Sequence, residues 1–161
     1  MLVLVVAVVA LAIAPSALAQ TLTIEVTSLT TQVKAHDLAP KGRANRGDSI
    51  DFRDLLVNRQ PQFGKAKGKA VAYDVGTMTY TSATATRIDV TATFTGIGTI
   101  HFAGRFVTRK DGTTVVPITG GTGGFRGATG TVTIGKGATA APNTYVVTVP
   151  HFLDLHATGV A

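Results

Sequence analysis

Hydrophobic and polar residues alternate along most of the chain after Gln20. Between Thr21 and Val33, apolar side chains at positions 22, 24 and 26 alternate with polar ones, which is the two-residue period of a strand with one buried face. No apolar run in this region has a helical period, and the same alternation predicts seven further strands. They are expected at Ser49–Val57, Ala66–Thr79, Arg87–Thr95, Thr99–Thr108, Thr113–Thr119, Phe125–Ile134 and Thr144–Pro150.

The links between these segments are short, apart from a long loop expected at residues 34–48. Links of about two to five residues suit antiparallel hairpins. Eight antiparallel strands in one small domain most simply close into a barrel, and a barrel of that size can hold one small ligand. The sequence therefore predicts an all-β protein with a single eight-stranded antiparallel barrel domain at residues 20–161.

The first 19 residues differ from the rest because they carry no charge. An apolar run of about 13 residues is followed by Pro15 and by the small-residue pattern Ala17-Leu18-Ala19, which is typical of a signal peptide cleaved after Ala19. The alternative, a membrane anchor, needs about 20 apolar residues. We therefore expect residues 1–19 to be a signal peptide. The mature protein is expected outside the cell or in its envelope, with no stable membrane span after cleavage.

The chain has 18 Gly, many Thr and no Cys. Without cysteine there is no disulfide, no thiolate metal site and no cysteine nucleophile. The fold must depend on its core and its hydrogen-bond ladder, which favours a closed sheet over one with open edges. The four histidines show no ligand spacing such as His-x-His. We expect no metal and no cofactor.

Glycines concentrate in one late stretch, residues 117–130, with the sequence PITGGTGGFRGATG. Glycine adopts positive φ and allows backbones to approach closely, so residues 120–124 are expected to form a tight turn or bulge and the later glycines to bend a strand. A phosphate-binding loop is excluded, because Gly-Lys-Ser/Thr is absent and Arg126 stands where a dinucleotide fingerprint needs glycine. The structural motif consists of Gly120, Gly121, Gly123, Phe125, Gly127 and Gly130.

This motif resembles the glycine-rich signature of the allene oxide cyclase and dirigent superfamily, which joins two late strands of a barrel. Three other segments resemble elements of the same superfamily in the same order: GDSIDFRDLL at 47–56, FGKAKG at 63–68 and IHFAG at 100–104. The resemblance implies an eight-stranded calycin-like barrel that is commonly a homotrimer and has an apolar lumen.

The resemblance also implies a function. Allene oxide cyclases close an unstable fatty-acid epoxide, and dirigent proteins are secreted and steer phenoxy-radical coupling, so catalysis is largely the orientation of a bound apolar molecule. We expect a barrel that binds a small hydrophobic ligand and directs its cyclisation or stereoselective coupling, as a cofactor-free isomerase or cyclase if it is an enzyme. The alternative is a non-catalytic ligand-binding or envelope-associated barrel. The cyclase pocket cysteine corresponds to a position near Ala70 here, which favours that alternative.

Asp54 is the first candidate for a catalytic residue, because it shares a predicted strand face with the apolar Phe52. A buried, unpaired carboxyl has a raised pKa and can donate a proton. The resemblance implies that the matching cyclase residue is an Asn that fixes a water. We expect Asp54 to be catalytic and Phe52 to bind the ligand. Alternatively, Asp54 lies at a strand end, solvated or paired with Arg53 or Arg59.

Three further candidates follow from the strand pattern and the resemblance. Glu25 corresponds, within one residue of register, to a carboxylate on the first strand of the cyclases and is the second catalytic candidate. His101 and Arg105 share one face of their strand and are candidates for binding a ligand in the lumen, where an Arg could pair with a ligand carboxylate. The alternative for this pair is a solvated strand face.

The formal net charge of the chain is +6. Most of it comes from residues 41–69, where eight Lys and Arg stand against three Asp. This segment could contact anionic envelope polymers or lipid head groups. Alternatively, it is a solvated loop and an edge strand protected by lysines. No nucleic-acid partner is expected, because the basic residues are not interleaved with aromatic ones and the chain is predicted to be secreted.

Overall fold

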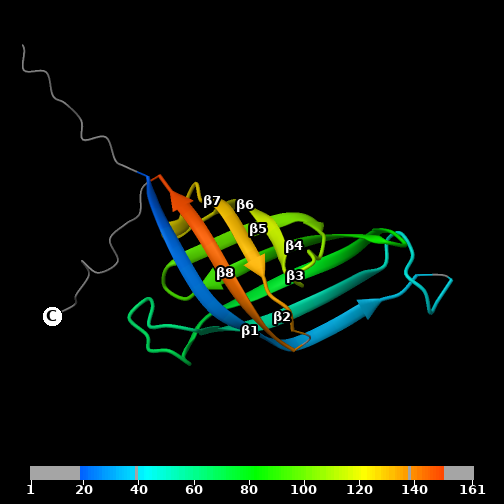
Figure 1. Cartoon of the computed structure of the whole chain (residues 1–161), viewed down its shortest axis with the longest axis horizontal. Helices are drawn as coiled ribbons and strands as arrows, with labels where there is room; N and C mark the ends of the chain where they lie inside the picture. Colours follow the sequence, from blue (N-terminus) through cyan, green and yellow to red (C-terminus); the bar gives the residue numbers. More distant parts are fainter. Residues whose placement is uncertain (1–18, 39, 138, 151–161) are drawn as a thin grey trace, which may run out of the picture.

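The computed structural model describes residues 19–38, 40–137 and 139–150, and the predicted signal peptide, Ala19 excepted, lies outside them. The eight strands form one closed antiparallel barrel in sequence order, with β8 paired to β1 (Figure 1). The predicted fold class is therefore confirmed. The strands are β1 (Gln20–His36), β2 (Ser49–Asn58), β3 (Ala70–Ser82), β4 (Ala85–Phe94), β5 (Gly98–Phe106), β6 (Thr114–Gly121), β7 (Thr129–Ile134) and β8 (Ala140–Val149).

The alternation along each strand separates an inner face from an outer one. On β4, Ile88, Val90, Ala92 and Phe94 are all buried, while the residues between them face outward. Threonine is frequent on the outer face, where its branched side chain suits an extended backbone. In the described part of the chain, no helix is long and apolar enough to cross a membrane.

Several strand boundaries differ from the predicted ones. β1 continues to His36, because after an irregularity between Thr30 and Gln32 it keeps pairing with the start of β2. β3 begins only at Ala70, because residues 59–69 form a loop held by the Asn58 side chain. β7 begins at Thr129 instead of position 125, and β8 begins at Ala140 instead of position 144.

The glycine-rich motif forms the turn between β6 and β7, as predicted, and contains a short 3-10 helix, η1 (Gly123–Phe125). Gly123 has a φ of 59°, and a Cβ on it would collide with the carbonyl oxygen of Ile97. Only glycine fits both conditions without strain. The turn brings the fully buried Phe125 into one end of the barrel.

Four aromatic rings fill this end and are called the aromatic plug below. Phe94 lies at their centre, with ring centroids 5.2 Å from Phe125, 5.5 Å from Phe63 and 6.0 Å from Tyr145. Phe94 ends β4, Phe125 lies in the β6–β7 turn and Phe63 lies in the β2–β3 loop, so all three belong to the same end of the barrel. At the opposite end the β1–β2 and β3–β4 hairpins extend past the other strands (Figure 1).

Candidate functional site

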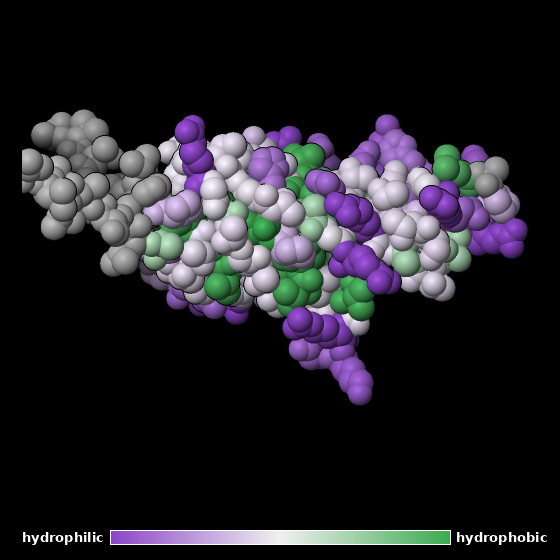
Figure 2. All heavy atoms as spheres, turned by 90° about the horizontal axis from the view of Figure 1, so that it is seen from above, coloured by the Kyte–Doolittle hydropathy of each residue, from purple (hydrophilic) through white to green (hydrophobic). Residues whose placement is uncertain are grey.

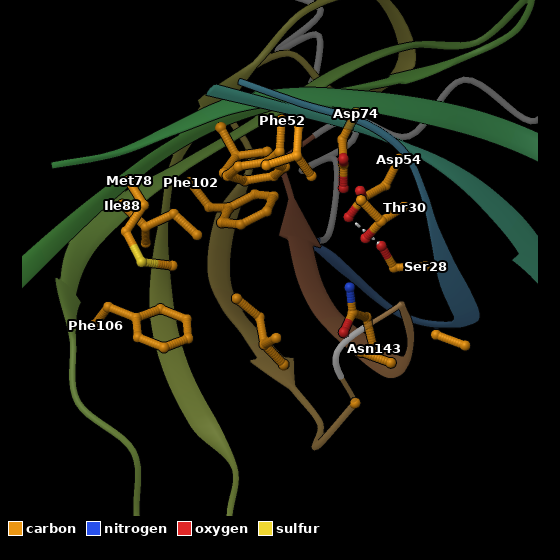
Figure 3. Close-up of a pocket in the computed structure, with 16 residues that line it drawn as sticks. Ser28, Thr30, Phe52, Asp54, Asp74, Met78, Ile88, Phe102, Phe106 and Asn143 are labelled. Carbon is orange, nitrogen blue, oxygen red and sulfur yellow. Dashed lines mark hydrogen bonds between the residues drawn. The ribbon is translucent and has the colours of Figure 1, made fainter. Parts of the chain in front are cut away.

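A cavity of about 210 Å³ occupies the barrel between the aromatic plug and the opposite end. One side, the polar wall, comes from β1, β2, β3 and β8, and the other, the apolar wall, from β4, β5 and β7. Figure 3 shows the two sides facing each other. The polar wall consists of Ser28, Thr30, Asp54, Asp74 and Asn143, and the apolar wall of Ile88, Val90, Phe102, Phe106 and Ile134.

Asp54 and Asp74 form the centre of the polar wall. They are direct partners in the β2–β3 register, and Asp74 is only 2% exposed. The Ser28 hydroxyl donates a hydrogen bond of 2.5 Å to Oδ2 of Asp54. The Oδ1 atoms of both aspartates are buried and have no hydrogen-bond partner within the described part of the chain. The lumen therefore contains two carboxyl groups with free acceptor positions.

Burial, and secondly the charge of Asp54, raises the pKa of Asp74 from 3.8 to about 7, although a backbone hydrogen bond from Asp54 acts in the opposite direction. At neutral pH Asp74 can therefore either donate or accept a proton. Burial and the charges of Asp74 and Asp54 raise the pKa of the Tyr145 phenol well above its usual value, so this group stays protonated.

Phe52 forms the side of the cavity between the two walls, as Figure 3 shows. Its ring lies against Gly76 of β3, where a Cβ would stand 2.6 Å from Cζ of Phe52 and 2.7 Å from Cγ2 of Val90. The missing side chain at position 76 is thus what lets the phenyl ring lie back against the barrel wall. Both Phe52 and Asp54 line the lumen, and their roles in binding and catalysis stay predictions.

His101 and Arg105 lie on the outer face of β5, because the inward positions of this strand are Ile100 and Phe102. The His101 ring is hydrogen-bonded to the Thr91 hydroxyl at 2.9 Å, and Arg105 is exposed. The prediction that this pair lines the lumen is therefore wrong. The two residues lie on an outer strand face, as the alternative stated. Both faces of β5 carry bulky residues, so the sequence pattern did not reveal which one is inside.

Glu25 also faces outward, because its neighbours Ile24 and Val26 are buried in the barrel. It lines a shallow external groove together with Arg59 and Lys67. Because it points outward, Glu25 is not among the residues that line the lumen with Asp54, and its catalytic role stays a prediction.

Asp74 was missed by the sequence reasoning. The signal was present, because Asp74 alternates with Ala72, Gly76 and Met78 on one face of a predicted strand, the same pattern that identified Asp54. No three or more metal-ligating His, Cys, Asp or Glu side chains come together within residues 19–38, 40–137 and 139–150.

The basic segment at residues 41–69 does not form one patch. Its first cations belong to the β1–β2 loop and its last ones to the β2–β3 loop, which lie at opposite ends of an antiparallel barrel. Between them, the Arg53 guanidinium lies 4.7 Å from the centroid of the Tyr73 ring on the outer face. This division weakens the interpretation as a binding surface for anionic polymers and agrees with the solvated alternative.

Similar barrels occur among solved structures. A pyocyanin demethylase is 24% identical to this chain in sequence and superposes with a TM-score of 0.65. The match covers 78% of this chain and 99% of the demethylase chain. A pterocarpan synthase dirigent protein is 17% identical with a TM-score of 0.61, covering 81% and 84%. A nonspecific heme-binding cyclase that catalyses a cycloaddition during neoabyssomicin biosynthesis is 16% identical with a TM-score of 0.59, covering 86% and 70%.

No protein-family profile and no curated protein sequence matches the chain. The structural similarity shows that the chain has the barrel fold of dirigent proteins, as the glycine-rich motif predicted.

Proposed function

We propose that this barrel binds a small, mainly apolar molecule in its lumen and directs its cyclisation or stereoselective coupling. The observation that carries the proposal is the pair formed by the buried Asp74 and the half-buried Asp54, which faces an apolar wall inside a cavity with one plugged end. At about 210 Å³, the cavity is larger than the roughly 150 Å³ that holds one benzene. It therefore suits a substituted ring or a hydrocarbon fragment of similar size.

The closed sheet supplies the first part of the mechanism. Side chains fixed on hydrogen-bonded strands hold the ligand in one conformation, so the entropy of reaching a reactive geometry is lost on binding and not in the reaction step. Asp74 supplies the second part, because with a pKa of about 7 it can protonate a ligand oxygen or remove a ligand proton. Ser28 holds the Asp54 carboxyl in place beside it. Such a cyclase or isomerase needs no cofactor.

The first test is to identify by mass spectrometry the small molecules that copurify with the full chain. A matched variant is Ile134→Trp, because Ile134 is half-buried in the apolar wall and a larger ring there would occupy the lumen. We expect a compound that is retained by the unchanged protein and lost from the variant. The same compounds in both preparations would contradict binding in the lumen.

The double variant Asp54→Asn and Asp74→Asn distinguishes the catalytic proposal from the non-catalytic alternative. If the carboxyl groups only bind the ligand, the double variant and the unchanged protein convert it equally slowly. If they catalyse, conversion falls by about 10²-fold or more, the usual contribution of general acid–base catalysis. Conversion is measured under single-turnover conditions on the compound identified by mass spectrometry.

We further propose that the mature protein starts at Gln20, is exported and assembles as a homotrimer. β1 begins at Gln20, directly after the predicted signal peptide. On the outer face, Leu29, Leu55 and Tyr73 are neighbours in register across β1, β2 and β3, and Leu55 is 38% exposed.

Exposed apolar groups of this kind favour contact between subunits, and Figure 2 shows apolar side chains exposed among polar ones on one face. The intact mass of the exported protein tests the cleavage site. Light scattering tests the assembly, and a monomer would contradict the trimer.

A further inference from the structure

Most of the buried side-chain atoms around the lumen that have no hydrogen-bond partner in the described part of the chain are acceptor oxygens. In the described part of the chain, four buried side-chain atoms have no partner, and three of them are the Oδ1 atoms of Asp54, Asp74 and Asn143. The fourth is the hydroxyl of Tyr145. Asn143 is 5% exposed and also lines the cavity. Because native proteins rarely leave buried polar atoms unpaired, the occupant of this lumen is expected to bring hydrogen-bond donors.

In the described part of the chain, the lumen also has no positively charged lining residue. Its described lining includes Asp54 and Asp74 but no Lys, Arg or His. A buried carboxylate without a counter-ion is unfavourable, and a cation that reaches it forms short, charge-assisted hydrogen bonds. An anionic ligand would add a like charge in surroundings of low dielectric constant, where repulsion is strong.

The apolar side of the cavity is suited to a ring. Phe52, Phe102 and Phe106 all line it, together with aliphatic side chains of β4 and β7. Aromatic faces pack against other rings and attract cations. We propose that the lumen takes a cationic ligand, an amine carried on one aromatic ring, with its ammonium group at Asp54 and Asp74 and its ring against the phenylalanines. This inference rests on the proposed binding function and specifies its ligand class.

The proposal predicts a dependence on pH that can be derived from the surroundings of Asp74. The titratable groups that face it inside the barrel are Asp54 from β2 and Tyr145 from β8. The inward β4 residues beside it, Val90 and Ala92, do not ionise. With a pKa of about 7 for Asp74, its ionised fraction rises from about one-tenth near pH 6 to about nine-tenths near pH 8. Affinity for an ammonium ion that needs the carboxylate should therefore rise about tenfold.

Three probes of nearly equal shape test the charge preference: phenethylamine, phenethyl alcohol and phenylacetate. Each is titrated calorimetrically into the full-length chain near pH 6 and near pH 8, where the amine remains protonated. We expect phenethylamine to bind at least about tenfold more tightly than the alcohol near pH 8, and phenylacetate to bind most weakly. The alcohol should not gain affinity as the pH rises.

Two variants assign the effect to the lumen. Asp74→Asn should abolish the pH dependence and most of the preference for the amine. Asp89→Asn removes an exposed carboxylate from the outer face of β4 and should leave both unchanged. An equal loss in the two variants would show a general charge effect and overturn the proposal.

The outcomes also separate this proposal from the function on which it depends. If the alcohol or phenylacetate binds as tightly as the amine, the cationic ligand class is wrong but a binding lumen stands. If none of the probes binds while another compound copurifies in the lumen, the ligand class is again wrong. If no probe binds and nothing copurifies, both proposals fail.

Discussion

Asp54 on β2 and Asp74 on β3 are direct cross-strand partners, and both side chains line the same cavity. Like charges at directly opposite positions of a sheet destabilise it, and burial adds to this cost. The unfavourable arrangement lies at a cavity that has space for a ligand. A group with a perturbed pKa in a cleft is typical of a functional site, and Asp74, whose pKa burial raises to about 7, is such a group. Asp74 and its partner Asp54 are the reason why we place the site here.

The first prediction concerns the stability of the unliganded barrel as a function of pH. The ordinary pKa of an aspartate carboxyl is 3.8, and burial and the charge of Asp54 raise that of Asp74 to about 7 in the folded state. Below about pH 3.8, Asp74 is protonated in both the folded and the unfolded chain. Between these two pKa values the unfolded chain releases a proton that the folded chain keeps, so stability falls as the pH rises to about 7. The loss is of the order of 4 kcal/mol above that pH.

Asp74→Asn should remove this loss. We expect the variant to be more stable than the unchanged protein near pH 8 and about equally stable near pH 4, as measured by urea denaturation at both pH values. Hydrogen bonds lower the pKa values of Asp51 and Asp111. These two groups affect both proteins in the same way, so they cancel in the difference in stability between the variant and the unchanged protein. Parallel stability curves for the two proteins would show that Asp74 does not titrate in this range.

The second prediction concerns the size of the lumen. A Cβ at position 76 would lie 2.6 Å from Cζ of Phe52, so Gly76→Ala should push the phenyl ring into the cavity. We expect a destabilisation of about 1–3 kcal/mol, as for other overpacked cores, and a selective loss of affinity for ligands with a ring. The double variant Phe52→Ala and Gly76→Ala removes the clashing ring but keeps the close contact with Val90, so its destabilisation should be smaller than the sum of those of the two single variants. If the destabilisation in the double variant is as large as that sum, the clash with Phe52 is not the cause of the destabilisation by Gly76→Ala.

Much of the fold was predictable because a barrel strand has one apolar face. The alternation in Arg87–Thr95 identified β4, Ala85–Phe94, to within two residues at each end, and the glycine motif identified the β6–β7 turn. The extension of β1 to His36 was not predictable, because it depends on pairing with β2, including the contact of 2.9 Å between the side chains of His36 and Asp51.

The candidate site was predictable only where an ionisable residue interrupts an apolar face. Asp54 satisfies that condition. His101 and Arg105 do not satisfy it, because both faces of β5 carry bulky residues. Only the closed barrel determines that Phe102 points inward. The Asp54–Asp74 pair requires the β2–β3 register, which depends on a loop whose length the sequence pattern did not give.

The third prediction concerns the two ends of the lumen. Phe125 is fully buried in the aromatic plug, and Phe125→Ala should cost about 3–5 kcal/mol. Phe106 lines the cavity and is only half-buried, so Phe106→Ala should cost less and enlarge the ligand space. Urea denaturation measures the first effect, and binding of a bulkier ring measures the second. Equal costs for both variants would contradict the distinction between a plugged and an open end.

The fourth prediction concerns the residues that the barrel places outside. Arg105 is exposed on the outer face of β5, opposite Arg87, so Arg105→Ala removes neither a lumen contact nor an ion pair with its cross-strand neighbour. We expect ligand affinity to be unchanged and stability to change by less than about 0.5 kcal/mol. Phe52→Ala is the positive control, because the phenyl ring lines the cavity and its loss should weaken binding. Calorimetric titration of both variants with the same ligand decides the matter. If Arg105→Ala weakens binding as much as Phe52→Ala does, the ligand binds on the outer face of β5 and the lumen is not the site.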